Sequence, residues 1–166
     1  IIKYTYSLDN KKSSVILQEG NETKLQANIK EGDNTKNVTI NALGNKSEEV
    51  IDSFGNTVEI RDIGKGSLDE KRIVTKYEYD KNDNKVKEIY QKGDYKTFIY
   101  DFEGKLIKEE HFTKDNHKVE DISYEYDLAG NSIKSVQNKY DLSNNKVSSR
   151  YIINGYDERN RLVSCY

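Results

Sequence analysis

Residue pairs that favour tight turns recur along the chain at intervals of about 10 to 14 residues, apart from a longer gap after Gly55-Asn56 that contains Gly64 and Gly66. Each pair contains glycine, asparagine or aspartate, the residues that most readily adopt the positive φ angles of such turns. Gly-Asn and Gly-Asp suit two-residue type II′ hairpin turns, with glycine in the first position. The spacing predicts strands of about 6 to 9 residues joined by hairpins. The pairs are Gly20-Asn21, Gly32-Asp33, Gly44-Asn45, Gly55-Asn56, Asp83-Asn84, Gly93-Asp94, Gly104-Lys105, Asp115-Asn116, Gly130-Asn131, Asn144-Asn145 and Asn154-Gly155.

The segments between these pairs have the residue pattern of strands. Ile122, Tyr124 and Tyr126 form one row with a period of two, and residues 147 to 153 form another. This period is the signature of a half-buried strand, and β-branched and aromatic residues fill the rows. No stretch has the spacing of a helix, and the chain contains no proline that would interrupt a sheet. We predict an all-β fold, an antiparallel meander of about 12 short hairpin-linked strands.

The composition limits the size of the hydrophobic core. Apolar residues make up 34% of the 166 residues, and charged residues make up another 34%. Disorder is usually accompanied by few aromatic residues and a large net charge, whereas this chain has 13 tyrosines and a net charge of −2. We therefore expect a folded chain with a thin core of fewer than two full layers, a curved or single-layer sheet.

Charge, hydropathy and cysteine content exclude several classes of protein. The near-neutral charge provides no basic excess for phosphates, so we predict no nucleic-acid partner. No apolar run approaches the roughly 18 residues of a membrane span. Cys165 is the single cysteine and cannot form an internal disulfide. Since the chain contains no methionine, we expect it to be a processed form or a piece of a longer protein.

We expect one repeat-built domain over residues 1–166. The composition of its predicted strands changes along the chain, since eleven of the 13 tyrosines follow residue 71. Residues 1–63 read as degenerate repeats, residues 64–71 as an irregular loop that forms a bend, and residues 72–166 as clear repeats.

A short phrase in which tyrosine precedes aspartate recurs in the second half of the chain. It begins at Tyr79, Tyr100, Tyr126, Tyr140 and Tyr156, and each copy is followed by a turn residue and then by leucine, isoleucine or valine. We expect each aspartate to accept a hydrogen bond from a backbone N–H of the turn that it opens. The predicted turn residues are Asp80, Asp101, Gly104, Asp127, Gly130, Asn131, Asp141 and Asp157.

These copies resemble the YD repeat of the Rhs family, over residues 77–166 in particular. The resemblance implies strand–turn–strand units that form a segment of a β shell, of the kind in which bacterial toxin complexes enclose a toxic polypeptide. It also implies a secreted or cell-surface location. The chain is too short to close such a shell. Because it has no proline, the Asp-Pro step of the family's self-cleavage motif is absent, and autoproteolysis is not expected.

The sequence contains no strong signature of catalysis or metal binding. His111 and His117 flank a predicted turn, which more often holds solvated histidines than zinc. Asp80, Asn82 and Asn84 have the spacing of a calcium loop, but the glycine and glutamate that such a loop needs further on are absent. We predict no catalytic residue, no cofactor and no metal.

Our main prediction is a non-catalytic structural or scaffold segment of a bacterial YD-repeat surface or toxin-delivery protein. Its partners would be further repeats of the same parent chain or an enclosed polypeptide. The alternative is an extracellular module that binds glycan or protein through rows of exposed tyrosines. The candidate surface for that alternative is formed by Tyr77, Tyr79, Tyr100, Tyr124 and Tyr126. An enzyme with an unrecognised site is the third hypothesis.

Overall fold

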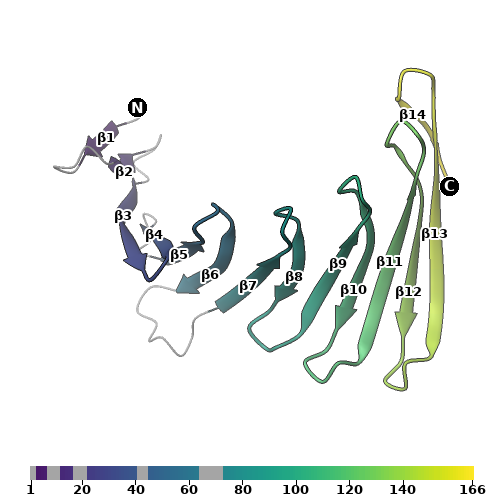
Figure 1. Ribbon diagram of the computed structural model, residues 1–166, viewed down its shortest axis with the longest axis horizontal. Helices are drawn as coiled ribbons and strands as arrows, with labels where there is room; N and C mark the ends of the chain where they lie inside the picture. Colours follow the sequence, from purple (N-terminus) through teal and green to yellow (C-terminus); the bar gives the residue numbers. More distant parts are fainter. Residues whose placement is uncertain (1–2, 7–11, 17–21, 41–44, 64–72) are drawn as a thin grey trace. The chain divides into compact units, whose positions relative to one another are not determined.

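The computed structural model describes residues 3–6, 12–16, 22–40, 45–63 and 73–166 (Figure 1). Side chains are described over residues 32–39, 45–63 and 74–166. The predicted loop over residues 64–71 and the turn glycines Gly20 and Gly44 lie outside the described residues.

The described residues form β-strands joined by turns, as the sequence predicted, and the described part contains no helix. The strands are β1 (Lys3–Tyr6), β2 (Lys12–Ile16), β3 (Glu22–Glu31), β4 (Asn34–Ile40), β5 (Lys46–Ile51), β6 (Thr57–Ile63), β7 (Ile73–Tyr79), β8 (Lys85–Ile89), β9 (Tyr95–Tyr100), β10 (Leu106–Phe112), β11 (Lys118–Tyr126), β12 (Ser132–Tyr140), β13 (Lys146–Tyr156) and β14 (Leu162–Cys165).

The chain divides into two compact units, Ile1–Tyr77 and Glu78–Tyr166. Within each unit every strand pairs in antiparallel fashion with its neighbours in sequence. This order confirms the predicted meander, with 14 described strands where the sequence indicated about 12. The boundary between the units does not test whether residues 1–166 act as one domain, which stays a prediction.

In the second unit the strands lengthen along the chain. β8 has 5 residues, β9 has 6, β10 has 7, β11 and β12 have 9 each, and β13 has 11. Figure 1 shows these strands side by side in one layer, with their turns along two opposite edges. The single layer agrees with the low apolar content of the sequence.

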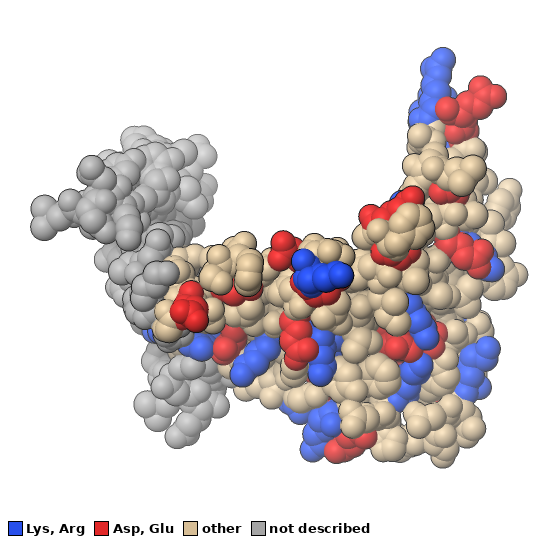
Figure 2. Space-filling view, viewed as in Figure 1, with Lys and Arg blue, Asp and Glu red and all other residues tan. Residues whose placement is uncertain are grey.

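The hydrophobic core of the described residues is very small. Val38 and Val50 of the first unit are the buried apolar residues, each 3% exposed. Glu48, directly opposite Val38 on the neighbouring strand, is equally buried, and its carboxylate pairs with Lys46 and Arg61. Charged side chains therefore cover apolar surface with their aliphatic stems. Figure 2 shows Lys and Arg interspersed with Asp and Glu over the visible face of the described part.

One predicted turn has the expected length. Glu31 and Asn34 are register partners with two residues between them, and Gly32 has φ 63°. This is the two-residue turn predicted for Gly32-Asp33, with glycine first.

The prediction of two-residue type II′ turns is wrong for Gly55-Asn56, Gly93-Asp94 and Gly130-Asn131. In the turn at Asp127 the Gly130 N–H donates to the Asp127 carbonyl, and the Asp127 N–H donates to the Asn131 carbonyl. Three residues thus lie in the loop, and Gly130 occupies its last position with φ 86°. This is a three-residue hairpin loop, in which the last residue has left-handed backbone angles and forms a bulge. The turns at Asp52, Asp80, Tyr90, Asp101, Thr113, Asp141 and Asp157 have the same two backbone hydrogen bonds.

Asn154-Gly155 was predicted as a turn but lies inside β13, where Gly155 pairs with Ser164 of β14. A Cβ atom at residue 155 would meet the Ser164 hydroxyl oxygen. Glycine here leaves room for that side chain on the facing strand and does not serve a positive φ angle.

In six of the described hairpins the turn is followed by a shift in strand register, whereas the ladder of β8 and β9 is regular. After the turn at Asp127, Tyr126 pairs with Ser132 while Glu125 pairs with Lys134, so the ladder skips Ile133. A bulge of this kind increases the local twist of a strand. The skipped residues in six hairpins are all β-branched: Val58, Ile107, Val119, Ile133, Val147 and Val163. In the copies that begin at Tyr126 and Tyr140 the skipped residue is the apolar residue that closes the phrase, whereas Leu106 and Leu162 are paired and the residue after each is skipped.

None of the described residues belongs to a helix with the length and apolar character of a transmembrane span.

We predict that Gly130→Val will destabilise the second unit by about 1–2 kcal/mol, because a β-branched residue is strained at a positive φ angle. Gly130→Asn is the matched control, since asparagine adopts the corresponding loop position at Asn144 with φ 61°. Urea unfolding followed by circular dichroism measures both. Equal stability of Gly130→Val and the wild type would contradict this account of the turn.

Candidate functional site

The aspartate of the repeat holds its turn with one carboxylate oxygen. In the turn at Asp127, Oδ1 accepts hydrogen bonds from the backbone N–H groups of Ala129 and Asn131, both at 2.9 Å. These N–H groups would otherwise lack a partner in the loop, because the ladder bonds end at the turn. The same pair of bonds is present at Asp52, Asp80, Asp101, Asp141 and Asp157.

The second carboxylate oxygen binds the side chain that follows the turn glycine or its substitute. Asn84, Asn131 and Asn145 donate through Nδ2 to Oδ2 of their aspartates, at 3.1, 2.9 and 3.2 Å. At Asp157 the donor is the Arg161 guanidinium, at 2.8 Å. The pKa values of these aspartates lie below the usual range, because hydrogen bonds favour the charged carboxylate. The side-chain bond is the largest cause at Asp80 and Asp127, and the backbone N–H bond is the largest cause at Asp141 and Asp157.

The calcium-like spacing of Asp80, Asn82 and Asn84 has a structural explanation. Asp80 accepts from the backbone N–H groups of both asparagines, at 2.8 and 3.0 Å, and from the Asn84 side chain. The spacing of these three residues therefore reflects hydrogen bonds within the turn. The described part of the chain contains no group of three residues that could hold a metal ion.

The tyrosines that precede these aspartates tie neighbouring strands together. The hydroxyl of Tyr126, at the end of β11, donates to the Leu106 carbonyl at the start of β10 at 2.7 Å. The ladder between these two strands ends at Lys108 and Ser123, before it reaches Leu106. β10 and β11 are joined by a turn at the opposite edge, so the hydroxyl closes the edge at which no turn joins them.

The same tie recurs along that edge of the second unit. Tyr100 donates to the Lys85 carbonyl at 2.9 Å, and Tyr156 donates to the Ser132 carbonyl at 3.2 Å. In each case the acceptor is the residue that directly follows the preceding repeat turn on the same edge. We call these three contacts the tyrosine ties. Burial raises the pKa values of Tyr100 and Tyr126.

Turns that lie next to each other on an edge also bind directly. Along one edge, Asn131 Nδ2 donates to Asn160 Oδ1 at 3.1 Å. Along the other edge the Lys114 N–H donates to Asp94 Oδ1 at 3.0 Å, and the Lys118 N–H donates to Asn144 Oδ1 at 3.1 Å. The partners are between 20 and 29 residues apart, so sequence spacing alone did not indicate them.

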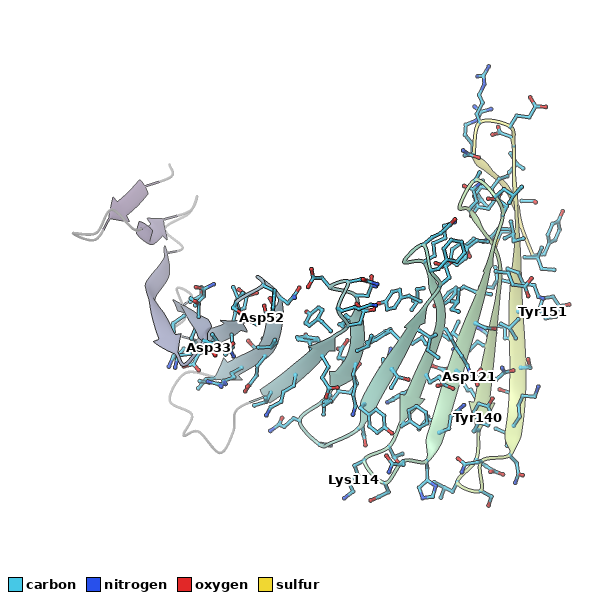
Figure 3. The ribbon with its side chains drawn as sticks, viewed as in Figure 1. Asp33, Asp52, Lys114, Asp121, Tyr140 and Tyr151 are labelled. Atoms are coloured by element: carbon cyan, nitrogen blue, oxygen red, sulfur yellow. The ribbon has the colours of Figure 1, made fainter. Side chains whose placement is uncertain are left out.

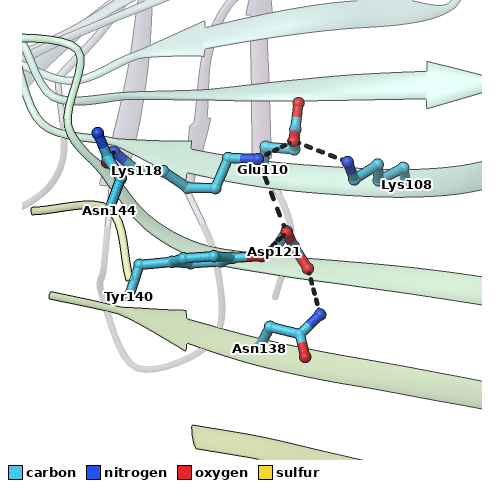
Figure 4. Close-up of polar contacts among 7 residues, drawn as sticks. All are labelled: Lys108, Glu110, Lys118, Asp121, Asn138, Tyr140 and Asn144. Atoms are coloured by element: carbon cyan, nitrogen blue, oxygen red, sulfur yellow. Dashed lines mark hydrogen bonds and ion pairs between the residues drawn. The ribbon is translucent and has the colours of Figure 1, made fainter. Parts of the chain in front are cut away.

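A charged network joins β10, β11 and β12 close to the second edge (Figure 4). Asp121 is 5% exposed and accepts hydrogen bonds from the Tyr140 hydroxyl at 2.6 Å and from Asn138 Nδ2 at 2.8 Å. Lys118 lies 2.6 Å from Glu110 and 3.7 Å from Asp121. Lys108 lies 2.9 Å from Glu110. Tyr140 thus links β12 to β11 at the edge where no turn joins them, as the tyrosine ties do on the opposite edge.

The network keeps its carboxylates charged. Burial by itself raises the pKa of Asp121, but the hydrogen bonds from Tyr140 and Asn138 and the charges of Lys108 and Lys118 outweigh it and lower the pKa. The pKa of Glu110 is lowered in the same way by Lys118 and Lys108. These groups are satisfied by one another, which is the arrangement of a structural cluster.

The five tyrosines of the predicted binding surface are all half-buried. The hydroxyls of Tyr100 and Tyr126 are used in ties, and burial raises the pKa of Tyr124. Tyr77 and Tyr79 fall in different units. A contiguous binding surface of these five residues stays a prediction.

Among the tyrosines whose side chains are described, the two most exposed were not part of the predicted surface. Tyr151 on β13 is 63% exposed and Tyr166 is 81% exposed. Figure 3 labels Tyr151 on the last long strand of the second unit. Period-two alternation places residue 151 on a strand but gives no signal for the exposure of its side chain.

The histidines that flank a predicted turn do not form a metal site in the structure. The ring of His111 lies against Tyr90, with centroids 6.4 Å apart in an edge arrangement. His117 lies in the turn and donates its backbone N–H to the Thr113 hydroxyl at 3.2 Å. Neither imidazole belongs to a metal-binding cluster within the described residues.

We predict that Tyr126→Phe will lower the free energy of unfolding by about 1 kcal/mol, because it removes one hydrogen bond and leaves the Leu106 carbonyl without its partner. Tyr151→Phe is the control, since its exposed side chain should change stability by less than about 0.5 kcal/mol. Urea unfolding measures both. Equal effects of the two substitutions would show that the tie does not stabilise the sheet.

We predict that Asp121→Asn will cost about 2 kcal/mol at pH 7, where the carboxylate accepts charge-assisted bonds. A carboxyl whose pKa is lowered by folding stabilises the fold above its unfolded pKa of about 3.9. That stabilisation is lost as pH falls through the folded pKa, so the difference between variant and wild type should shrink below about pH 4. Unfolding titrations at several pH values measure this difference, with exposed Asp115→Asn as the control. A difference that stays constant with pH would contradict the prediction.

No protein-family model matches the sequence, and neither does any curated protein. Solved structures of toxin complexes do have a similar fold. A chain of the Photorhabdus luminescens Tc holotoxin pore matches 97% of this chain with a TM-score of 0.69 and 18% identity. Chains of the TcdB2–TccC3 and TcdB2–TccC3–Cdc42 crystal structures match 97% with a TM-score of 0.69 and 19% identity. The present chain spans only 8–9% of the length of these chains, and it shares its fold with a segment of them.

Proposed function

We propose that this chain is a non-catalytic structural segment of a bacterial YD-repeat protein of the toxin-delivery or cell-surface type. Its β-sheet would form part of a wall that encloses or contacts a polypeptide partner, together with further repeats of the parent chain. The tyrosine ties are the main support for this proposal. The same hydroxyl-to-carbonyl hydrogen bond recurs along one edge and holds neighbouring strands of a single-layer sheet together.

The small amount of buried apolar surface supports a wall-like role. In the part of the chain whose side chains are described, only Val38 and Val50 are buried apolar residues, so the sheet there packs very little hydrophobic core. A catalytic or small-ligand pocket usually needs a concave apolar site with convergent polar groups. A sheet whose strands are held by turns and ties can instead be extended by adding repeats.

The fold likeness supports the same role at the level of architecture. Nearly the whole chain superposes on a small part of much longer toxin-complex chains. This relation is expected for one stretch of a repeat-built wall. A secreted or cell-surface location is part of the proposal and follows from the same likeness.

The carboxylates support the non-catalytic part of the proposal. The turn aspartates are each engaged by two backbone N–H groups, and Asp121 and Glu110 are engaged by hydrogen bonds or lysines. A general acid or base needs a proton-exchanging group poised toward a substrate. The described carboxylates with lowered pKa values instead accept hydrogen bonds or form ion pairs within their own turns and with neighbouring strands.

The glycan-binding alternative has less support. A carbohydrate site would use exposed aromatic faces, whereas Tyr100 and Tyr126 are half-buried and tie strands through their hydroxyls. We therefore place binding to protein above binding to glycan.

Nitration of the folded chain by tetranitromethane, followed by peptide mapping, tests the proposed role of the tyrosines. We expect rapid modification of Tyr151 and Tyr166 and slow modification of Tyr100, Tyr126 and Tyr156. A glycan array run in parallel should give no saturable binding. Rapid nitration of the tie tyrosines, or glycan binding that Tyr124→Ala abolishes, would overturn the scaffold proposal in favour of the binding module.

A further inference from the structure

The strands of the second unit meet at two kinds of border. Along one edge lie the turns at Asp80, Asp101, Asp127 and Asp157, and we call it the tie edge because the tyrosine ties lie there. Strands that are joined by a turn at the opposite edge are closed at the tie edge by a tyrosine tie. We call their borders seams, and they lie between β8 and β9, β10 and β11, and β12 and β13.

The seam between β8 and β9 has the shortest backbone ladder of the three. It contains three register pairs, whereas the seam of β10 and β11 contains five and that of β12 and β13 contains seven. Toward the tie edge the ladder ends at Lys87 and Thr97, although β8 begins at Lys85. The Tyr100 hydroxyl donates to the Lys85 carbonyl at 2.9 Å. This tie therefore closes a stretch that the described ladder does not reach.

The turn at the other end of this seam lacks the aspartate of the repeat. Tyr90 occupies the aspartate position, and its ring lies against His111 with the centroids 6.4 Å apart. The carboxylate of Asp94 accepts the Lys114 N–H of the neighbouring turn at 3.0 Å. Tyrosine carries no carboxylate that could accept two loop N–H groups as Asp127 does. We therefore expect this turn to be held less firmly than the turns built on aspartate.

β9 is held strongly to β10, its partner on the side away from the seam. Their ladder contains six register pairs. Lys96 of β9 forms an ion pair with Glu109 of β10 at 2.5 Å. Tyr95 stacks on Phe112 of β10, with ring centroids 5.0 Å apart. The hairpin of β9 and β10 therefore has its own side-chain contacts and does not rely on β8.

The described ring contacts across the seam are weaker. The Lys87 ammonium lies 4.8 Å from the centroid of the Tyr95 ring, and the Lys85 ammonium lies 4.9 Å from the centroid of the Phe98 ring. Cation–π contacts contribute little where the cation remains in water. The seam of β10 and β11, by contrast, is crossed by the charged network, with an ion pair of 2.6 Å.

We propose that the seam between β8 and β9 opens locally in the folded protein, and that the Tyr100 tie is its latch. The opening starts at the tie edge, where one hydroxyl closes the seam, and proceeds toward the turn at Tyr90. β9 stays on β10, and β8 stays on the turn that Asp80 holds. The sheet thus yields at one defined place while its other strands keep their register. This conformational device goes beyond the proposed scaffold role.

Backbone direction identifies the amides that report on the seam. The Tyr90 N–H donates across the turn to the Asp94 carbonyl. Hydrogen-bonding direction alternates along a strand, so Ile89 directs its N–H away from β9 and Glu88 directs its N–H toward it. Glu88 and its register partner Lys96 therefore bond to each other across the seam.

Amide hydrogen exchange of the folded chain, followed by NMR at several low urea concentrations, measures the opening. Amides that exchange through a local opening respond little to urea, whereas those that exchange through global unfolding respond steeply. Thr97 and Glu110 are the reference pair, because they bond in the same way between β9 and β10. We expect Glu88 and Lys96 to exchange at least about tenfold faster than this pair and with little dependence on urea.

Two matched substitutions test the latch. Tyr100→Phe should raise the exchange rates of Glu88 and Lys96 about fivefold, because it removes one hydrogen bond from the closed seam. Tyr126→Phe removes the tie of the seam between β10 and β11, and it should leave these two rates near the wild-type values. The rates of Thr97 and Glu110 show whether either substitution acts through global stability instead.

A cross-link supplies the converse test. Lys87 and Thr97 are register partners at the end of the ladder, and alternation makes them a pair whose side chains approach closely. Lys87→Cys and Thr97→Cys are combined with Cys165→Ser, which removes the exposed free thiol. The oxidised protein should show slower exchange at Glu88 and Lys96 than its reduced form. Tyr100→Phe should then no longer raise these rates.

Several outcomes would overturn the inference. They are equal rates and equal urea dependence at the seam pair and the reference pair, equal acceleration of the seam pair by Tyr100→Phe and Tyr126→Phe, and acceleration by Tyr100→Phe that persists in the oxidised cross-linked protein. Each of them would leave the scaffold function standing, because the nitration experiment tests that function separately.

Discussion

The hydrogen bonds of the repeated turn are the interaction on which the rest of this structure depends. Each aspartate uses one carboxylate oxygen to satisfy two backbone N–H groups of a three-residue loop. A single-layer sheet gains little from apolar burial, so unpaired backbone groups at its turns would be costly. With the turns fixed, the strands keep the register that the ties and the charged network require.

The two edges of the second unit use different side chains for the same purpose. Tyrosine hydroxyls bind backbone carbonyls along one edge, whereas Tyr140 binds the buried Asp121 near the other. Both contacts join strands where no turn connects them. A sheet held in this way does not need a second layer to define its strands, which agrees with the proposed role as one stretch of a longer wall.

The sequence reading of the site succeeded where the chemistry was local and failed where it depended on distant residues. The role of Asp127 in its turn followed from a pattern of five residues. The role of Tyr126 did not follow from the sequence. Its acceptor lies 20 residues away and is a backbone carbonyl, a group that every residue carries. Gly155 was read as a turn residue, although its reason lies in Ser164 on the next strand. Gly130 was placed in a turn correctly but in a turn of the wrong length.

The sequence by itself determined the all-β fold, the meander order and the position of most turns, because period-two alternation and positive-φ residues act over a few neighbouring positions. Its low apolar content also determined that the core would be thin. Only the tertiary structure decided which tyrosines are tied, which turns contact one another and where each ladder shifts register. These features depend on residues brought together across strands, and turn spacing does not encode which hydroxyl meets which carbonyl.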